Sequence, residues 1–369
     1  MKNKWSMLYY IAISILFFVI TAGWSSLINL GILYNVSISF SLLLLLIYFL
    51  SYRHNFKQLL IIFILLIILT YTFIKTKNPI FLVNFMLIIS SKNIDIKKVI
   101  KIDIFIKLFF LIYHSVFYIF NLFFELGFID NIYFTTAHGL RQSLFFSGPN
   151  ALSAIVFWSI IDYLYLNKDK KIIRKSIICL IPLFICYIFA KTRTTFYLYF
   201  VYLILISISK SDLGKKIINI MHYSVGDILF GFSFLIVVFS NFIISHFYTA
   251  FEIVDKLLSN RLIYSVRAYN EYGLNLLANI PALINKDKYI IDNFYILTII
   301  SYGIIIYLVL SLICKMFHKK ADIYSKIIII VAFIYLFFEA LSFNGGLCIF
   351  ITLLGYLFYK DKKNEGDVS

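Results

Sequence analysis

One long polar segment interrupts this otherwise apolar chain: HFYTAFEIVDKLLSNRLIYSVRAYNEYGLNLLANIPALINKDKYIIDN, residues 246–293. It contains five basic and five acidic residues and is the longest interval between two apolar segments. The flanking segments, 228–245 and 293–314, are each long enough to cross a bilayer, which takes about 17–25 residues. We therefore expect residues 246–292 to form a large loop outside a membrane that the rest of the chain crosses.

The composition places the chain among membrane proteins. Of its 369 residues, 62% are hydrophobic and 14% are charged, whereas soluble domains have about one quarter charged residues. We predict an all-α, polytopic integral membrane protein in which residues 1–369 form a single domain. The twelve predicted spans are 7–22, 30–50, 59–74, 79–90, 102–124, 150–166, 172–190, 196–209, 228–245, 293–314, 324–340 and 343–359.

The distribution of lysine and arginine predicts the orientation of these spans. Positive charge is retained on the cytoplasmic side of a membrane. With the N-terminus inside, 23 of the 34 basic residues fall in inner segments and 10 in outer ones. Both termini are then cytoplasmic, the tail 360–369 is a solvated cytoplasmic end, and the loop 246–292 is extracytoplasmic. The Lys2 and Lys4 start is typical of a signal peptide, but because many spans follow we expect a retained first helix.

Several function classes are disfavoured by the sequence. The net charge of +16 is scattered in short clusters beside apolar segments, and no basic stripe with interleaved aromatics indicates nucleic-acid binding. The four cysteines lie in or at the edge of apolar spans, which favours neither disulfides nor a zinc site. The outer carboxylates are not clustered as metal ligands, and the first outer loop, 23–29, has no acidic residue. We predict no metal and no cofactor.

Two shorter outer loops hold candidate site residues. The loop 125–149 contains His138 and Arg141, and Asn150 follows it either as an N-cap or as a site residue. The turn at 191–195 places Lys191 and Arg193 among three threonines, which is a pattern that can bind an anion. Anchoring to lipid headgroups is the alternative for these cations.

The long loop supplies further candidates. Residues 260–277 have helical spacing with Asn260 as N-cap, and Arg261, Tyr264, Ala268 and Tyr272 fall on one face. Arg267 lies on another face, one turn before Glu271, as a structural pair. Asp292 closes the loop, either as an acidic site residue or as an N-cap. Within the spans, Asp103 and Lys107 are spaced to pair, and Glu339 near an outer end is a weaker candidate.

Four short motifs resemble, in order, those of Wzy-type polysaccharide polymerases in the O-antigen ligase and polymerase superfamily. Arg141 with SLFFSGPN is similar to an arginine followed by aromatics and His-Pro-Asn, with Gly148 in place of the histidine. AKTRTTF resembles the family's Ser-Arg-Thr-Gly turn and places Arg193 on its arginine. LSNRLIYSVRAY resembles the Gly-Arg helix and places Arg261, and DNFYILTIISYGII resembles the segment that ends the large loop.

The resemblance implies an activity at the outer face of the bacterial cell membrane, in capsule, exopolysaccharide or O-antigen synthesis. A growing glycan is transferred from undecaprenyl diphosphate to the next lipid-linked repeat unit. Arg141, Arg193 and Arg261 would stabilise the diphosphate without a metal, and Asp292 would be the base, with His138 or His246 second. Lys191, Tyr264 and Asn150 would bind substrate. Partners would be the lipid-linked substrates, membrane lipids, and candidate flippase and chain-length proteins.

Two other functions fit the same sequence features. A single-transfer polysaccharide ligase of the same superfamily would share all four motifs. A flippase for lipid-linked oligosaccharides is also basic and polytopic, but we expect it to show an internal repeat and charges in a central cavity. In this chain the charged residues named as site candidates lie in outer loops or at their edges.

Overall fold

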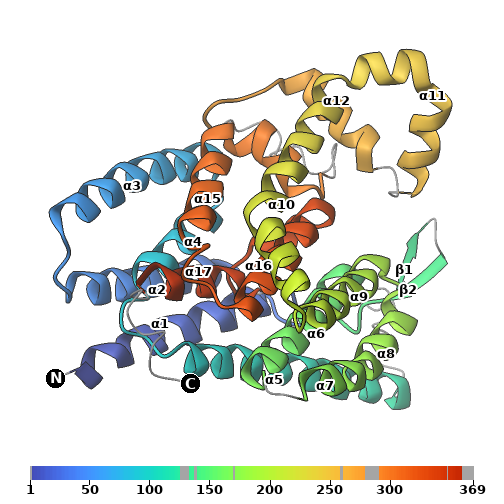
Figure 1. The fold of residues 1–369 in the computed structure, drawn as a ribbon. Coiled ribbons are helices and arrows are strands. Elements are labelled where there is room, and N and C mark those ends of the chain that lie inside the picture. The colour runs from blue at the N-terminus through green and yellow to red at the C-terminus, as the bar shows by residue number, and fades with distance from the viewer. Residues whose placement is uncertain are drawn as a thin grey trace.

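The computed structural model describes residues 2–124, 133–136, 139–168, 171–257, 261–278, 291–346 and 348–359, and nearly all of its elements are helices (Figure 1). The first half contains α1 (Lys2–Ala22), α2 (Ile32–Leu50), α3 (Phe56–Thr76), α4 (Ile80–Ile89), α5 (Ile96–Phe124), β1 (Tyr133–Thr136), β2 (Gly139–Gln142), α6 (Pro149–Leu166), α7 (Ile172–Ile178), α8 (Leu180–Ala190) and α9 (Arg193–Ile208). The second half contains α10 (Asp212–Val238), α11 (Ser240–Leu257), α12 (Arg261–Tyr272), α14 (Phe294–Leu297), η2 (Thr298–Tyr302), α15 (Ile304–Met316), α16 (Ile323–Phe338), η3 (Ala340–Phe343) and α17 (Ile349–Tyr359).

Length and composition confirm a multi-pass, helical membrane protein. Seven helices in the described part of the chain are long and apolar enough to cross a membrane, counting the consecutive helices α7 and α8 as one. Five shorter apolar helices, α4, α9, α15, α16 and α17, account for the remaining predicted spans. Twelve crossings, their orientation and the cell membrane as their location stay predictions.

Two hydrogen bonds join loops that the sequence predicts on the same side of the membrane. Ser26 N donates to Phe145 O at 2.8 Å, which joins two predicted outer loops. Lys92 Nζ donates to Arg53 O at 2.7 Å, which joins two predicted inner ones. This grouping fits the predicted alternation of inner and outer segments along the chain.

The prediction of a purely helical chain misses one hairpin. Strands β1 and β2 pair antiparallel, with Phe134 opposite Arg141, inside the expected outer loop 125–149. In Figure 1 the hairpin projects at the edge of the molecule, near α8 and α9. Short local pairing is possible here because the segment lies between spans.

The predicted tenth span is not one continuous helix. It begins as α14, continues as the π-helical turn η2, and restarts as α15 after Gly303, whose φ is +92°. The backbone of Asn275 and Leu276 fills the break, because Ile304 N donates to Asn275 O at 3.0 Å. A side chain at Gly303 would collide with Leu276 O at 2.5 Å, so only glycine fits.

The ninth span also differs from the prediction. Helix α10 begins at Asp212, well before the expected start at 228, and ends at Val238. The remainder of that span continues into α11, which is kinked at Phe247. The long loop therefore begins as a helix, and Figure 1 shows α11 and α12 together at one corner of the molecule.

Helices α6 and α16 lie at the centre of the fold. Most residues of both are buried, α6 packs against α5 and α8, and α16 packs against α9 and α10. The predicted pair of Asp103 with Lys107 is confirmed at 2.8 Å, and Asp162 of α6 also lies 2.7 Å from Lys107 Nζ. Because all three are buried, this ionic group ties α5 to α6, and removing one member would cost about 3–5 kcal/mol.

Candidate functional site

Three arginines predicted from three separate outer loops meet at one cavity of about 620 Å³. We call it the arginine cavity. It is lined by Arg141, Asn150, Lys191, Thr192, Arg193, Thr194, Tyr197, Leu198, Val201, Arg261, Ile334, Phe338 and Glu339. Five of the lining residues are candidates named from the sequence: the three arginines, Lys191 and Asn150.

Arg141 is held by two neighbouring elements. It lies on β2, and its Nε donates to Ala190 O at the end of α8 at 2.7 Å. Its Nη2 donates to Asn150 Oδ1 at 2.9 Å. Burial and the nearby Arg261 lower the pKa of Arg141, while Glu339 opposes them. Arg141 therefore contributes a fixed, partly desolvated positive charge.

Asn150 is not the N-cap that its position suggests. Gly148 occupies the cap, Pro149 is the first helical residue of α6, and no side chain among the described residues caps the helix. The Asn150 amide instead bridges two charges, because its Nδ2 donates to Glu339 Oε1 at 3.0 Å while its oxygen accepts from Arg141. Asn150 is thus part of the site.

Arg261 makes the most contacts of the three arginines. Its Nη1 donates to Phe338 O at 2.7 Å, its Nη2 lies 2.6 Å from Glu339 Oε1, and its Nε lies 2.9 Å from Asp292 Oδ2. It is the first residue of α12, where a cation is unfavourable for the helix dipole. Its position is therefore determined by the two carboxylates and not by helix stability. Asn260, the predicted N-cap, lies outside the described residues.

Glu339 is the residue that the sequence underrated. It directly follows α16, and its side chain is only 4% exposed. Burial raises its pKa to about 7, and Asp292 adds to this rise, while Arg261 and Arg141 oppose it. The signal in the sequence is one acid at the end of a long apolar run. Only the fold shows that Glu339 shares a cavity with three arginines from different loops.

Asp292 lies on the other side of Arg261. It lines a second cavity, of about 380 Å³, together with residues such as Trp24, Tyr34 and Asn78, and does not line the arginine cavity. Burial raises its pKa against the effect of Arg261. It is not an N-cap, because Asn293 caps α14 by accepting from Ile296 N at 3.1 Å. Asp292 and Glu339 thus hold Arg261 from two sides.

Lys191 and Arg193 provide the uncommitted positive charge of the cavity. Lys191 ends α8 in a left-handed conformation with φ of 49°, and Arg193 begins α9. Both side chains are exposed, and no carboxylate in the described part of the chain pairs with either. Between them, the buried Thr192 is hydrogen-bonded to Ser153, which fixes the turn that carries Lys191 and Arg193. These two cations are available for an anionic ligand.

The remaining predicted site residues are not at this cavity. Tyr264 shares a face of α12 with Ala268, as predicted, but this face packs against Val237 and Ile300. His246 is on α11, exposed, and its ring stacks on Phe242. His138 lies outside the described residues.

The arginine cavity extends from the loops to apolar residues of α9 and α16. Arg193, Tyr197 and Val201 follow each other at one-turn intervals along α9, and Ile334 lies one turn below Phe338 on α16. Eight residues of helix span about 12 Å. The site therefore combines a cationic rim with an apolar wall. Among the residues that the structure describes, no three His, Cys, Asp or Glu side chains gather as metal ligands.

Comparison with known protein families, with curated proteins and with solved structures finds no match to this chain.

Proposed function

We propose that this protein polymerises lipid-linked oligosaccharide repeat units at the outer face of the cytoplasmic membrane. One observation carries the proposal: Arg141, Arg193 and Arg261, from three distant segments, line one cavity with a buried carboxylate. A lipid diphosphate has an anionic head and an apolar chain. The cationic rim suits the head, and the wall formed by Tyr197, Leu198 and Val201 suits the chain.

The proposed reaction transfers the glycan in one displacement. The acceptor hydroxyl oxygen attacks the anomeric carbon of the donor and forms the new C–O bond. The bond from that carbon to the diphosphate oxygen breaks, and the electron pair leaves with undecaprenyl diphosphate. Lys191 and Arg193 bind the diphosphate, and Arg141 and Arg261 stabilise the charge that grows on it.

A base must take the proton of the attacking hydroxyl. Asp292 is the first candidate from the sequence, but its carboxylate lines the second cavity and meets the arginine cavity only through Arg261. Glu339 lines the arginine cavity itself, and a pKa of about 7 suits a base that works near neutral pH. We assign the proton transfer to Glu339 and the positioning of Arg261 to Asp292.

The experiment that tests the proposal uses the purified protein in vesicles with an undecaprenyl-diphosphate-linked repeat unit. We expect a ladder of products on a glycan gel, and we expect Arg141→Ala to form it about 100- to 1000-fold more slowly. A single addition would indicate a ligase. Translocation of the substrate with no new glycosidic bond would indicate a flippase and refute the proposal.

A further inference from the structure

A third cavity, also polar, lies at the ends of α6 and α16 opposite to the arginine cavity. It has a volume of about 460 Å³ and is lined by Ile96, Lys97, Tyr165, Leu166, Asn167, Lys168, Asp322, Ser325, Tyr356 and Leu357. These residues come from the start of α5, the end of α6, the start of α16 and the end of α17. We call it the inner cavity, because all four helix ends fall on the predicted cytoplasmic side.

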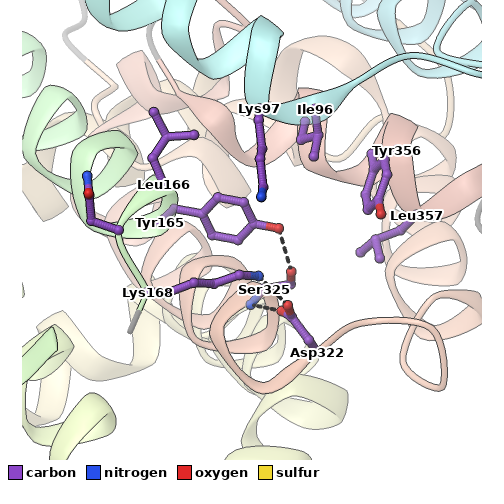
Figure 2. A pocket seen from close by; sticks show the side chains of 10 residues that line it. Ile96, Lys97, Tyr165, Leu166, Lys168, Asp322, Ser325, Tyr356 and Leu357 are labelled. Carbon is purple, nitrogen blue, oxygen red and sulfur yellow. Dashed lines mark hydrogen bonds and ion pairs between the residues drawn. The ribbon is translucent and has the colours of Figure 1, made fainter. Parts of the chain in front are cut away.

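Among the residues that the structure describes, the inner cavity contains one positive charge without an acidic partner. Lys168 Nζ lies 2.5 Å from Asp322 Oδ2, so these two charges offset each other. Asp322 Oδ1 is also occupied, because it accepts from Ser325 N at 2.7 Å as the N-cap of α16. Lys97 has an exposed side chain, and no carboxylate within the described ranges pairs with it. Figure 2 shows Lys97 extending from α5 toward the Tyr165 hydroxyl.

Neutral donors surround this charge. The Tyr165 hydroxyl and Ser325 Oγ are 3.3 Å apart, which is a long contact for two hydroxyl groups. Each can rotate to donate to a ligand instead. Tyr356 lies across the space from Tyr165 in Figure 2. Apolar side chains, Ile96, Leu166 and Leu357, complete the wall.

We propose that the inner cavity binds a phosphate group through one negative charge, with Lys97 as the counter-charge and Tyr165 and Ser325 as hydrogen-bond donors. A single uncompensated ammonium matches a single negative charge. Basic pockets between helices at the cytoplasmic surface suit phospholipid headgroups, and the apolar wall suits the glycerol backbone. A soluble phosphate compound presents the same chemistry. This site is separate from the arginine cavity and does not depend on the polymerase activity.

The test compares two neighbouring lysines of α5 in the purified full-length protein. Lys97→Gln removes the charge in the cavity. Lys98→Gln removes the same charge one residue later, where the exposed side chain lies near the Tyr10 ring and not in the cavity. Native mass spectrometry counts phosphatidylglycerol and phosphatidylcholine retained from mixed micelles. Thermal unfolding with added inorganic phosphate probes the soluble source.

We expect the wild-type protein and Lys98→Gln to retain phosphatidylglycerol in preference to phosphatidylcholine. Lys97→Gln should retain about fivefold less, the effect of one lysine near an anionic headgroup. If phosphate raises the unfolding temperature of the wild type but not of Lys97→Gln, without any lipid preference, the ligand is soluble and the site stands. If neither probe separates Lys97→Gln from Lys98→Gln, the proposal is wrong.

Discussion

The two ends of α16 carry similar ion pairs with opposite properties. At the outer end Glu339 pairs with Arg261, and at the inner end Asp322 pairs with Lys168. The Glu339 side chain is 4% exposed and its pKa is raised to about 7, whereas Asp322 is 40% exposed and its pKa is lowered. Burial raises both values, but only at Asp322 do the cation and the Ser325 groups outweigh it. Burial together with the neighbouring charges and hydrogen bonds therefore decides which carboxylate can exchange a proton near neutral pH.

The comparison predicts that Glu339→Gln has the largest effect. Polymer formation should fall by about 100- to 10,000-fold, the usual contribution of a general base. In the wild type, activity should fall about tenfold for each pH unit below 7, because Glu339 is then protonated and cannot accept the proton. The variant should lose this dependence. Initial rates of ladder formation between pH 5.5 and 8.5 give both quantities, with the half-exposed Glu252→Gln as control.

Arg261→Ala should have the next largest effect. It removes a donor to developing charge, which typically costs about 100- to 1000-fold in rate. It also leaves Glu339 and Asp292 without their shared cation. Arg267→Ala removes an exposed arginine from another face of α12 and should leave the rate within about twofold. Equal losses in the two variants would contradict the assigned role of Arg261.

Asp292→Asn distinguishes the role of Asp292 from that of Glu339. If Asp292 only positions Arg261, the rate should fall by about tenfold, as for groups that orient a functional side chain, and the pH profile should keep its shape. A collapse of the rate with a loss of the pH dependence would instead make Asp292 the base. The same rate assay over pH distinguishes the two results.

Arg193→Gln tests the uncommitted charge of the arginine cavity. Because no carboxylate among the described residues pairs with Arg193, its loss should weaken substrate binding without disturbing the ion pairs of Arg261. We expect KM to rise about tenfold while kcat changes by less than about threefold. The rise should be smaller at high salt, where exposed charges are screened. An unchanged KM would remove Arg193 from the binding site.

Lys168→Gln should produce the smallest change. Its ion pair with Asp322 is partly exposed, and such pairs contribute about 0–1 kcal/mol. The free energy of unfolding should therefore fall by less than about 1 kcal/mol, which chemical denaturation in detergent can measure. If Lys168→Gln and Arg261→Ala lowered the free energy of unfolding by the same amount in this assay, both ends of α16 would depend equally on their ion pairs.

Local sequence was enough to name all four cationic residues that line the arginine cavity. Arg141, Arg193 and Arg261 stand out because each lies between apolar spans, where a charge needs an explanation. Spacing also predicted the helix beginning near Arg261 and the shared face of Tyr264 and Ala268. The ranking of the carboxylates was beyond its reach, since Asp292 and Glu339 are 47 positions apart and both look like residues at a membrane boundary.

Hydrophobicity by itself determined that this chain is a multi-pass helical membrane protein, because a bilayer requires long apolar helices with satisfied backbone groups. Tertiary structure alone decided what the charges do. The burial of Glu339, the bridging role of Asn150 and the break filled at Gly303 arise from contacts between segments far apart in sequence. Pairwise distance and desolvation set these properties, and neither is encoded in the local pattern around a residue.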